Sequence, residues 1–236
     1  NVRNQDYYSV NVKNLLTYKK DLGKHGFTIL AGQEANEARW KGTALEARGF
    51  LSNNIQTISV SEADQILPTA NYVGSQALYS YFGRIIYDYD SRYSITASIR
   101  ADGSSKFAQG NQWGYFPSVS GTWNLAKENF LADNDYINKL QLRGSIGKVG
   151  STNVANFSYL QFFSTSSSNL YGGSTAVVAS TTLPNQNIGW ETTKEYNLGL
   201  DLSVIKDRIK GSFDYYNRST TGALAQTPVP LELGPS

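Results

Sequence analysis

Apolar and polar residues alternate with a period of two along several segments of the chain, which is the pattern of extended strands with two different faces. Near residue 97, for example, Ile95 and Ile99 share one face, whereas Arg100 lies on the other. Comparable alternation occurs over residues 8–18, 27–31, 79–89, 93–102, 113–125, 140–147, 196–204 and 209–216. The sequence therefore predicts an all-β, antiparallel fold with about eight strands.

The connections between these strands alternate between shorter and longer segments. The shorter ones are residues 21–26, 90–92, 126–136 and 205–207, and the longer ones are 48–75, 102–112 and 149–188. Consecutive antiparallel strands place alternate connections at opposite ends of a sheet, so all the long connections are expected at one end. Short periplasmic turns and long extracellular loops are typical of outer-membrane β-barrels.

Aromatic residues lie at both ends of the apolar stripes, as Tyr8 and Tyr18 do on one stripe and Trp113 and Trp123 on another. Rings at these positions are typical of the two lipid–water interfaces, and each stripe has the length that a tilted strand needs to cross a bilayer. The strand that starts at Phe27 is polar on both faces near Glu34, and we expect that end to project above the membrane. The pattern thus predicts a segment of an antiparallel transmembrane β-barrel.

Composition excludes several other classes of protein. The formal net charge is only +2, which gives no basic surface for nucleic acid. The chain has no cysteine, and hence no disulfide framework or thiolate metal site. Its single histidine, His25, is expected in a solvated turn and lacks the partners of a metal site or catalytic triad. We therefore expect neither a metal nor a cofactor.

Residues that superficially resemble catalytic motifs do not support an enzyme. Ser145 and Lys148 have the spacing of a Ser-x-x-Lys motif, but the partner motifs are missing and the serine lies on a predicted strand. Asp88 and Asp90 lie at a strand end beside a tight turn, where solvated carboxylates are common. A secreted β-rich glycosidase needs two placed carboxylates in a cleft, which the sequence does not offer. The prediction is that this chain is not an enzyme.

Several stretches in order along the chain resemble the SusC/RagA family of TonB-dependent outer-membrane transporters. The first are Arg100–Phe107 and Trp113–Ser120, and the next is Leu140–Gly147. Residues Leu183–Thr193 resemble a family element with Pro-Asn repeats before Trp-Glu, although Gln186 stands where the family more often has proline. Tyr196–Asp201, Asp214–Tyr216 and Pro228–Pro230 follow, so the resemblance covers about residues 6–231.

The resemblance implies a barrel of about 22 strands with a plugged lumen. Residues 1–236 would then be part of one barrel domain, without the plug domain or the two ends of the barrel. It further implies a cell outer-membrane location in a Gram-negative bacterium and active import of oligosaccharides or oligopeptides. The implied partners are a SusD-like surface lipoprotein that acts as a lid, outer-membrane lipid, and the TonB system acting through the missing N-terminal part.

Two sets of side chains are candidates for function. Polar residues on the expected lumen face are predicted to hydrogen-bond across the barrel interior and to the plug, and they include Arg84, Arg100, Asp102, Arg143 and Asp201. Aromatic residues in the long loops can stack on sugar rings, and the candidates for substrate binding are Phe107, Trp113, Tyr171 and Trp190. Trp113 and Trp190 are alternatively membrane-interface anchors.

A soluble all-β module that binds glycans at the cell surface is the alternative interpretation. Such a module must cover its apolar strand face with a second sheet, whereas a barrel exposes that face to lipid. Solubility without detergent separates the two, because an excised part of a barrel has unpaired edges and should aggregate. The loop 149–188 is rich in Ser, Thr, Gly and Asn and does not identify the cargo.

Overall fold

The computed structural model describes residues 2–48, 54, 66–131, 134–171, 174–179 and 184–223. Within these residues the chain forms ten strands and one short 3-10 helix, η3 (Leu125–Lys127). The strands are β1 (Val2–Leu22), β2 (His25–Ala47), β3 (Ile66–Tyr89), β4 (Tyr93–Ser104), β5 (Trp113–Asn124), β6 (Ile137–Ser151), β7 (Phe163–Tyr171), β8 (Ser174–Ala179), β9 (Glu191–Val204) and β10 (Ile209–Thr221).

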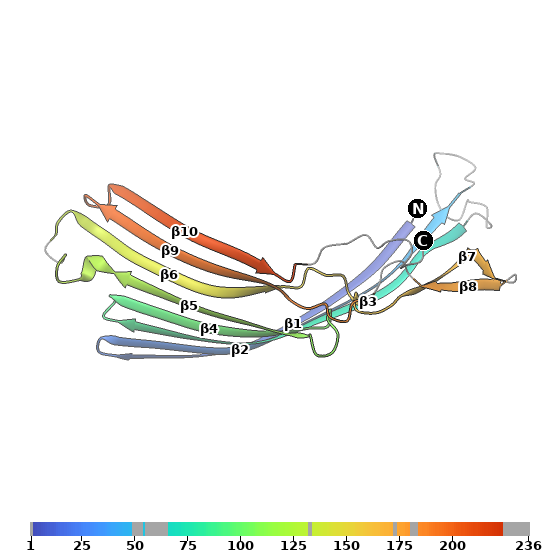
Figure 1. The fold of residues 1–236 in the computed structure, drawn as a ribbon, viewed down its shortest axis with the longest axis horizontal. Coiled ribbons are helices and arrows are strands. Elements are labelled where there is room, and N and C mark those ends of the chain that lie inside the picture. Colours follow the sequence, from blue (N-terminus) through green and yellow to red (C-terminus); the bar gives the residue numbers. More distant parts are fainter. Residues whose placement is uncertain are drawn as a thin grey trace. The chain divides into compact units, whose positions relative to one another are not determined.

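Eight of these strands form one sheet in the order β1-β2-β3-β4-β5-β6-β9-β10, so each strand lies beside its neighbour in sequence except where β7 and β8 intervene. Figure 1 shows β4, β5, β6, β9 and β10 side by side in this order. The β6–β9 ladder is antiparallel and runs from Ile137↔Val204 to Ser151↔Glu191. This confirms the predicted all-β sheet of eight strands.

The chain divides into two compact units, of which the smaller holds residues 1–12 and 35–78. Within it the Arg3 guanidinium donates a hydrogen bond of 3.0 Å to the Tyr72 hydroxyl, which in turn donates one of 3.0 Å to Gln5. A Cβ atom at Gly42 would lie 2.6 Å from the Tyr72 hydroxyl oxygen. The glycine therefore leaves the space through which Tyr72 on β3 reaches side chains on β1 across the intervening β2.

The larger unit holds residues 13–34 and 79–236, and its sheet has one apolar and one polar face. The apolar face carries Ile95, Ile99, Val119, Ile146, Leu198 and Phe213, at positions that the registers place in facing or neighbouring pairs. These side chains are about half exposed or more, for example 54% for Ile99 and 68% for Phe213. The polar face carries the intervening Ser, Thr, Asn, Arg and Asp residues. The strict alternation of the sequence thus becomes a division between two surfaces.

Few hydrophobic side chains are buried, because a single sheet has no second layer against which its apolar face can pack. Within the described residues only Ala38, Phe107 and Phe116 are buried hydrophobic side chains. No helix in the described part of the chain has the length and apolar character needed to cross a membrane.

Tight turns join three of the strand pairs at one end of the strands. Asp90 and Ser91 between β3 and β4 have φ values of 50° and 53°, and Ile205, Lys206 and Asp207 between β9 and β10 have φ values of 55°, 53° and 64°. Gly23, with φ of 60°, lies between β1 and β2. Left-handed backbone of this kind gives a turn whose twist matches that of the strands it joins.

Two features of the structure differ from the sequence prediction. β3 already begins at Ile66, so the last part of the predicted loop 48–75 is strand, whereas β2 ends at Ala47, directly before that loop, as predicted. The 149–188 connection contains the hairpin β7–β8, which the pattern did not predict. The sequence of residues 66–75 and the Ser-rich run after Phe163 show no period of two, so the pattern indicated no strand there although the backbone is extended.

Candidate functional site

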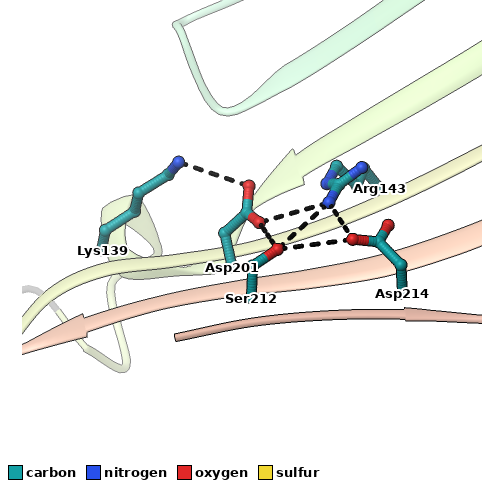
Figure 2. A network of polar contacts seen from close by, with 5 residues as sticks. All are labelled: Lys139, Arg143, Asp201, Ser212 and Asp214. Atoms are coloured by element: carbon teal, nitrogen blue, oxygen red, sulfur yellow. Dashed lines mark hydrogen bonds and ion pairs between the residues drawn. The ribbon is translucent and has the colours of Figure 1, made fainter. Parts of the chain in front are cut away.

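The polar face of the sheet carries a charged network that spans β6, β9 and β10. One Nη atom of Arg143 lies 2.9 Å from Asp214, 3.4 Å from Asp201 and 3.3 Å from the Ser212 hydroxyl oxygen. Lys139 approaches the other oxygen of Asp201 at 3.3 Å. Figure 2 shows these five side chains converging from three neighbouring strands.

The strand register explains this network. Gln141 faces Asp201 and Arg143 faces Gly199 across β6 and β9, and Gly199 in turn faces Asp214 across β9 and β10. A Cβ atom at Gly199 would lie 2.7 Å from the Arg143 guanidinium carbon. The glycine therefore lets the long Arg143 side chain cross β9 and reach a carboxylate two strands away.

A second network surrounds Arg100 on the same face of β4. Arg100 donates a hydrogen bond of 2.6 Å to Asp102 and one of 2.8 Å to the buried hydroxyl of Ser80, and it lies 3.7 Å from Glu34. Its guanidinium lies 5.3 Å from the centre of the Phe82 ring. Charge pairs therefore recur along this face and give its polar side chains hydrogen-bond partners within the sheet.

The predicted polar residues therefore share one face, and four of them are paired with one another. Arg100 contacts Asp102, and Arg143 contacts Asp201. Arg84 lies on β3 two residues from Phe82 and hence on the same face. Their predicted contact with a plug stays a prediction.

At the other end of the strands from the tight turns, Trp190 forms the centre of an aromatic cluster. Its ring centre lies 5.4 Å from that of Phe107 and 5.2 Å from that of Phe116, the latter in an edge-on arrangement. Its indole N–H donates a hydrogen bond of 3.0 Å to the carbonyl oxygen of Gln112. The cluster joins the β4–β5 connection to the segment that enters β9.

Two further hydrogen bonds join these long connections. The Asn111 side-chain amide donates to the Gln186 carbonyl oxygen at 3.0 Å, and the Lys106 ammonium donates to the Thr152 carbonyl oxygen at 3.1 Å. Beside them lies a pocket of about 300 Å³, lined in part by Trp113, Trp190 and Asn111. Trp190 and the Asn111 amide give this pocket a ring and a polar group, which can pack on a flat or ring-shaped group and hydrogen-bond its edge.

The structure brings together some of the aromatic residues predicted to bind substrate. Trp113 and Trp190 line the same pocket, although Trp113 also stacks on Tyr81 of the apolar face at 6.1 Å. Phe107 is fully buried behind Trp190. The side chain of Tyr171, the last residue of β7, lies outside the described residues. The substrate-binding role of all four residues stays a prediction.

Sequence reasoning missed Phe116 and Asn111, which also line this pocket. Phe116 appears in the alternation as an ordinary strand residue, and Asn111 as an ordinary loop residue. Only the long-range approach of residues 184–190 to the β4–β5 connection gives them a role, and the sequence carries no local signal of that approach.

The opposite end of the sheet holds a chain of ion pairs across the turns. Asp90 lies 3.1 Å from Lys24 and 3.3 Å from Arg92, and Arg92 lies 3.6 Å from Glu128. Glu128 accepts hydrogen bonds from the Tyr93 hydroxyl at 2.6 Å and the Trp123 indole N–H at 3.0 Å. These two donors, with the nearby positive charge of Arg92, hold the pKa of Glu128 below its usual value.

The residues that resembled catalytic groups are explained by structural contacts. Asp90 is paired with two cations at a turn, and Ser145 and Lys148 lie an odd number of residues apart on β6, on opposite faces. His25 is exposed, as the prediction of a solvated position expected, but it begins β2 directly after the turn at Gly23 and Lys24. It shares a hydrogen bond of 2.9 Å with the Tyr87 hydroxyl, and its ring centre lies 5.0 Å from that of Tyr89. In the described ranges no three His, Cys, Asp or Glu side chains are grouped to hold a metal ion.

Comparison with known proteins gives the family. The family model described as "TonB dependent receptor-like, beta-barrel" matches residues 1–235. The chain belongs to the TonB-dependent receptor β-barrel family. This confirms the resemblance drawn from the sequence motifs. The family comprises outer-membrane receptors and transporters of Gram-negative bacteria rather than enzymes.

Relatives of this TonB-dependent receptor barrel include two characterised sequences. "TonB-dependent receptor P3" of Formosa agariphila is 34% identical over 224 residues, and "TonB-dependent receptor SusC" of Bacteroides thetaiotaomicron is 33% identical over 228 residues. Each alignment covers 95% of this chain and 22% of the relative. The chain thus spans about a fifth of the length of the curated relatives that it matches.

Solved structures give the same fold. The chain superposes on a structure described as the RagAB peptide transporter with a TM-score of 0.86 and 26% sequence identity, covering 98% of this chain and 26% of that one. A structure of the RagAB peptide importer in an "open-open" state gives a TM-score of 0.84. The eight-stranded sheet therefore matches about a quarter of a complete transporter chain.

Proposed function

We propose that this chain forms part of the wall of an importer in the outer membrane of a Gram-negative bacterium. Its apolar face contacts lipid, its polar face lines the lumen, and its long connections lie at the cell surface. The observation that carries this proposal is the division of one sheet into an exposed apolar face and a face with paired charges.

The dimensions of the apolar face support a membrane-spanning role. On β5 the outward residues run from Tyr115 to Trp123, eight residue steps that cover about 27 Å at about 3.4 Å per step. A strand tilt of about 40° reduces this to a band about 20 Å tall, close to the apolar band of outer-membrane barrels. Trp123 stacks on Tyr93 at 6.2 Å, so rings from neighbouring strands gather at one margin of the band.

We further propose that the whole protein imports oligosaccharides or oligopeptides with energy from the TonB system and with a SusD-like surface lipoprotein as its lid. The similarity to the RagAB peptide transporter supports a peptide cargo, and the relative described as "TonB-dependent receptor SusC" supports dependence on TonB. The oligosaccharide alternative and the lipoprotein lid rest on the resemblance to the SusC/RagA family. The pocket between Trp113 and Trp190 is the proposed cargo contact of this segment, with Phe107 supporting Trp190 from behind. On this proposal the chain itself catalyses no reaction and holds no cofactor.

The alternative, a soluble all-β module that binds glycans, has less support. It requires a second layer over the apolar face, and in the described residues that face is exposed on β4, β5, β6, β9 and β10. The match to a transporter barrel over residues 1–235 also favours the wall of an importer.

The chain offers a direct test because it contains no native cysteine. Leu198→Cys and Asn197→Cys place single thiols on adjacent residues of β9 that point to opposite faces. The experiment uses the full-length protein in membranes, with any cysteine outside residues 1–236 replaced by serine. We expect a water-soluble maleimide to label Cys at 197 in the folded protein, and Cys at 198 only after unfolding, because a thiol in lipid stays protonated and unreactive.

Ile95→Cys and Ser94→Cys form a second adjacent pair on β4. The same labelling difference at this pair would show that it depends on the face of the sheet and not on the local surroundings of residues 197 and 198. Equal labelling of both positions by the water-soluble reagent, in a protein that stays in the soluble fraction, would contradict the membrane wall and favour the soluble module.

A further inference from the structure

The apolar face carries two lysines directly opposite one another near the end of the sheet that bears the long connections. Lys148 on β6 faces Lys194 on β9 in the antiparallel register. Both side chains are exposed, and both lie on the same face as Ile146 and Tyr196, which form the next outward pair. Like charges that face one another across two strands destabilise a sheet, so a pair in this position favours an anion between them.

Neighbouring acidic side chains do not neutralise this pair from the sheet. Glu195, the acidic neighbour of Lys194, points to the opposite face and pairs with Arg218 at 2.7 Å. In the part of the chain that the structure describes, neither lysine forms an ion pair. The two ammonium groups therefore present a net charge of about +2 at one point of an otherwise apolar surface.

An apolar groove begins at the same point. It has a volume of about 370 Å³ and is lined by the two lysines together with Pro117, Val119, Ile146 and Tyr196. The exposed area of its lining is mainly apolar, and Val119 and Ile146 are each 49% exposed. A groove of this length and character accepts a hydrocarbon chain rather than a soluble anion.

The groove has a cause in the sequence. The β5–β6 ladder runs from Asn124↔Gln141 to Ser118↔Gly147, whereas the β4–β5 ladder continues to Gly103↔Trp113. Pro117 is the first residue beyond the β5–β6 ladder, and it has no N–H to donate to a neighbouring strand. The two strands therefore separate at Pro117, and the opening between them lies beside Lys148.

We propose that this groove binds one phosphate-bearing lipid, with the phosphate between Lys148 and Lys194 and an acyl chain along Val119, Ile146 and Tyr196. The proposal rests on the proposed function, because it needs the apolar face to lie in a membrane. Lys148 follows Gly147, the last β6 residue that pairs with β5, so it lies near the level of Pro117, and Lys194 faces it on β9. Tyr115, at the aromatic margin, is the next outward residue of β5 after Pro117. That is the depth of lipid headgroups, where basic residues bind lipid phosphates.

The test is native mass spectrometry of the full-length protein in detergent, titrated with phosphatidylglycerol or with phosphatidylcholine of the same acyl chains. We compare the unsubstituted protein with the double variant Lys148→Gln/Lys194→Gln. The matched control is Lys20→Gln/Lys206→Gln, which removes the same charge from exposed positions near the tight turns.

We expect the unsubstituted protein and the control to retain phosphatidylglycerol, and the double variant to bind it about thirtyfold more weakly, at about five- to sixfold per lysine. Phosphatidylcholine should bind weakly to all three proteins. Equal retention of phosphatidylglycerol by the double variant, or equal binding of both lipids, would overturn the proposal. Displacement of phosphatidylglycerol by millimolar inorganic phosphate alone would also overturn the proposal. It would show that the lysines bind phosphate and that the apolar groove contributes nothing to the affinity for the lipid.

The cysteine labelling at residues 197 and 198 separates this proposal from the proposed function. If Cys at 198 is protected from the water-soluble maleimide and the lysine substitutions change no lipid binding, only the lipid site fails. If Cys at 198 is labelled from water, the membrane wall itself fails.

Discussion

At the scale of single residues, burial rather than residue type decides what an aromatic side chain does. Phe107 and Phe130 both lie in connections, yet Phe107 is fully buried against Trp190 and Phe130 is 70% exposed. The sequence gives both the same character, because neither lies on an alternating strand. Only the fold places residues 184–190 over the β4–β5 connection and so buries one of the two rings.

Substitution of Phe107 by alanine should therefore disturb the loop end of the sheet. Loss of a fully buried phenylalanine ring costs about 3–5 kcal/mol when the surroundings do not collapse. We expect Phe107→Ala to make the connections at residues 105–112 and 184–190 sensitive to limited proteolysis in the full-length protein, while Phe107→Leu keeps most of the packing.

Phe130→Ala is the control, and it should leave the proteolysis pattern unchanged because its ring is exposed. A Phe107→Ala protein as resistant as the control would show that the Trp190 cluster does not hold these connections together.

At the scale of elements, the tight turns show how strand ends accept unfavourable backbone. Ile205 has φ of 55°, a left-handed conformation that is a genuine outlier for a β-branched residue. Its N–H donates a hydrogen bond of 2.7 Å to the Tyr136 carbonyl oxygen, so the β9–β10 turn is joined to the segment before β6. The neighbouring connections hold the strained turn in place, which is how such conformations persist.

Relief of this strain gives a stabilising substitution. Asparagine tolerates left-handed backbone much better than isoleucine, and the 45% exposed Ile205 side chain contributes limited packing. We expect Ile205→Asn to raise the free energy of unfolding by about 1 kcal/mol, measured by urea unfolding of the full-length protein in detergent. Ile205→Val keeps the β-branch and should leave the free energy of unfolding unchanged. If Ile205→Val raised the free energy of unfolding as much as Ile205→Asn, the effect would come from side-chain contacts and not from backbone strain.

At the scale of the whole molecule, the sheet is a wall and lacks a core of its own. Its edges in the described residues are β1 and β10, whose backbone groups on one side have no neighbouring strand in this chain. Its apolar face is exposed across five strands. Both features are stable only when lipid covers the face and further strands cover the edges.

The isolated chain of residues 1–236 should therefore not persist as a monomer in water. We expect it to aggregate without detergent and to form β-rich, polydisperse species in detergent, because the edges of β1 and β10 pair between copies. Light scattering with circular dichroism measures both properties, and the full-length protein in the same detergent is the control. A folded, monodisperse monomer in detergent-free buffer would contradict the barrel wall and favour the soluble glycan-binding module.

The sequence by itself determined the strands of the larger unit, their two faces and the end at which the long connections lie. It could do so because a period of two is a local property, and in these strands one face is apolar while the other is polar. The early start of β3 at Ile66 and the β7–β8 hairpin were not predictable, because the sequence of these segments shows no period of two.

Tertiary structure alone decided which side chains meet. The crossing of Arg143 over Gly199 to Asp214, the burial of Phe107 beneath Trp190 and the approach of Lys148 to Lys194 each depend on strand register. Register is set by the sum of many pairings and by breaks such as Pro117, so no single segment of sequence encodes it. That is why the residues of the wall could be named from the sequence, whereas the pocket and the lipid groove appeared only in the folded sheet.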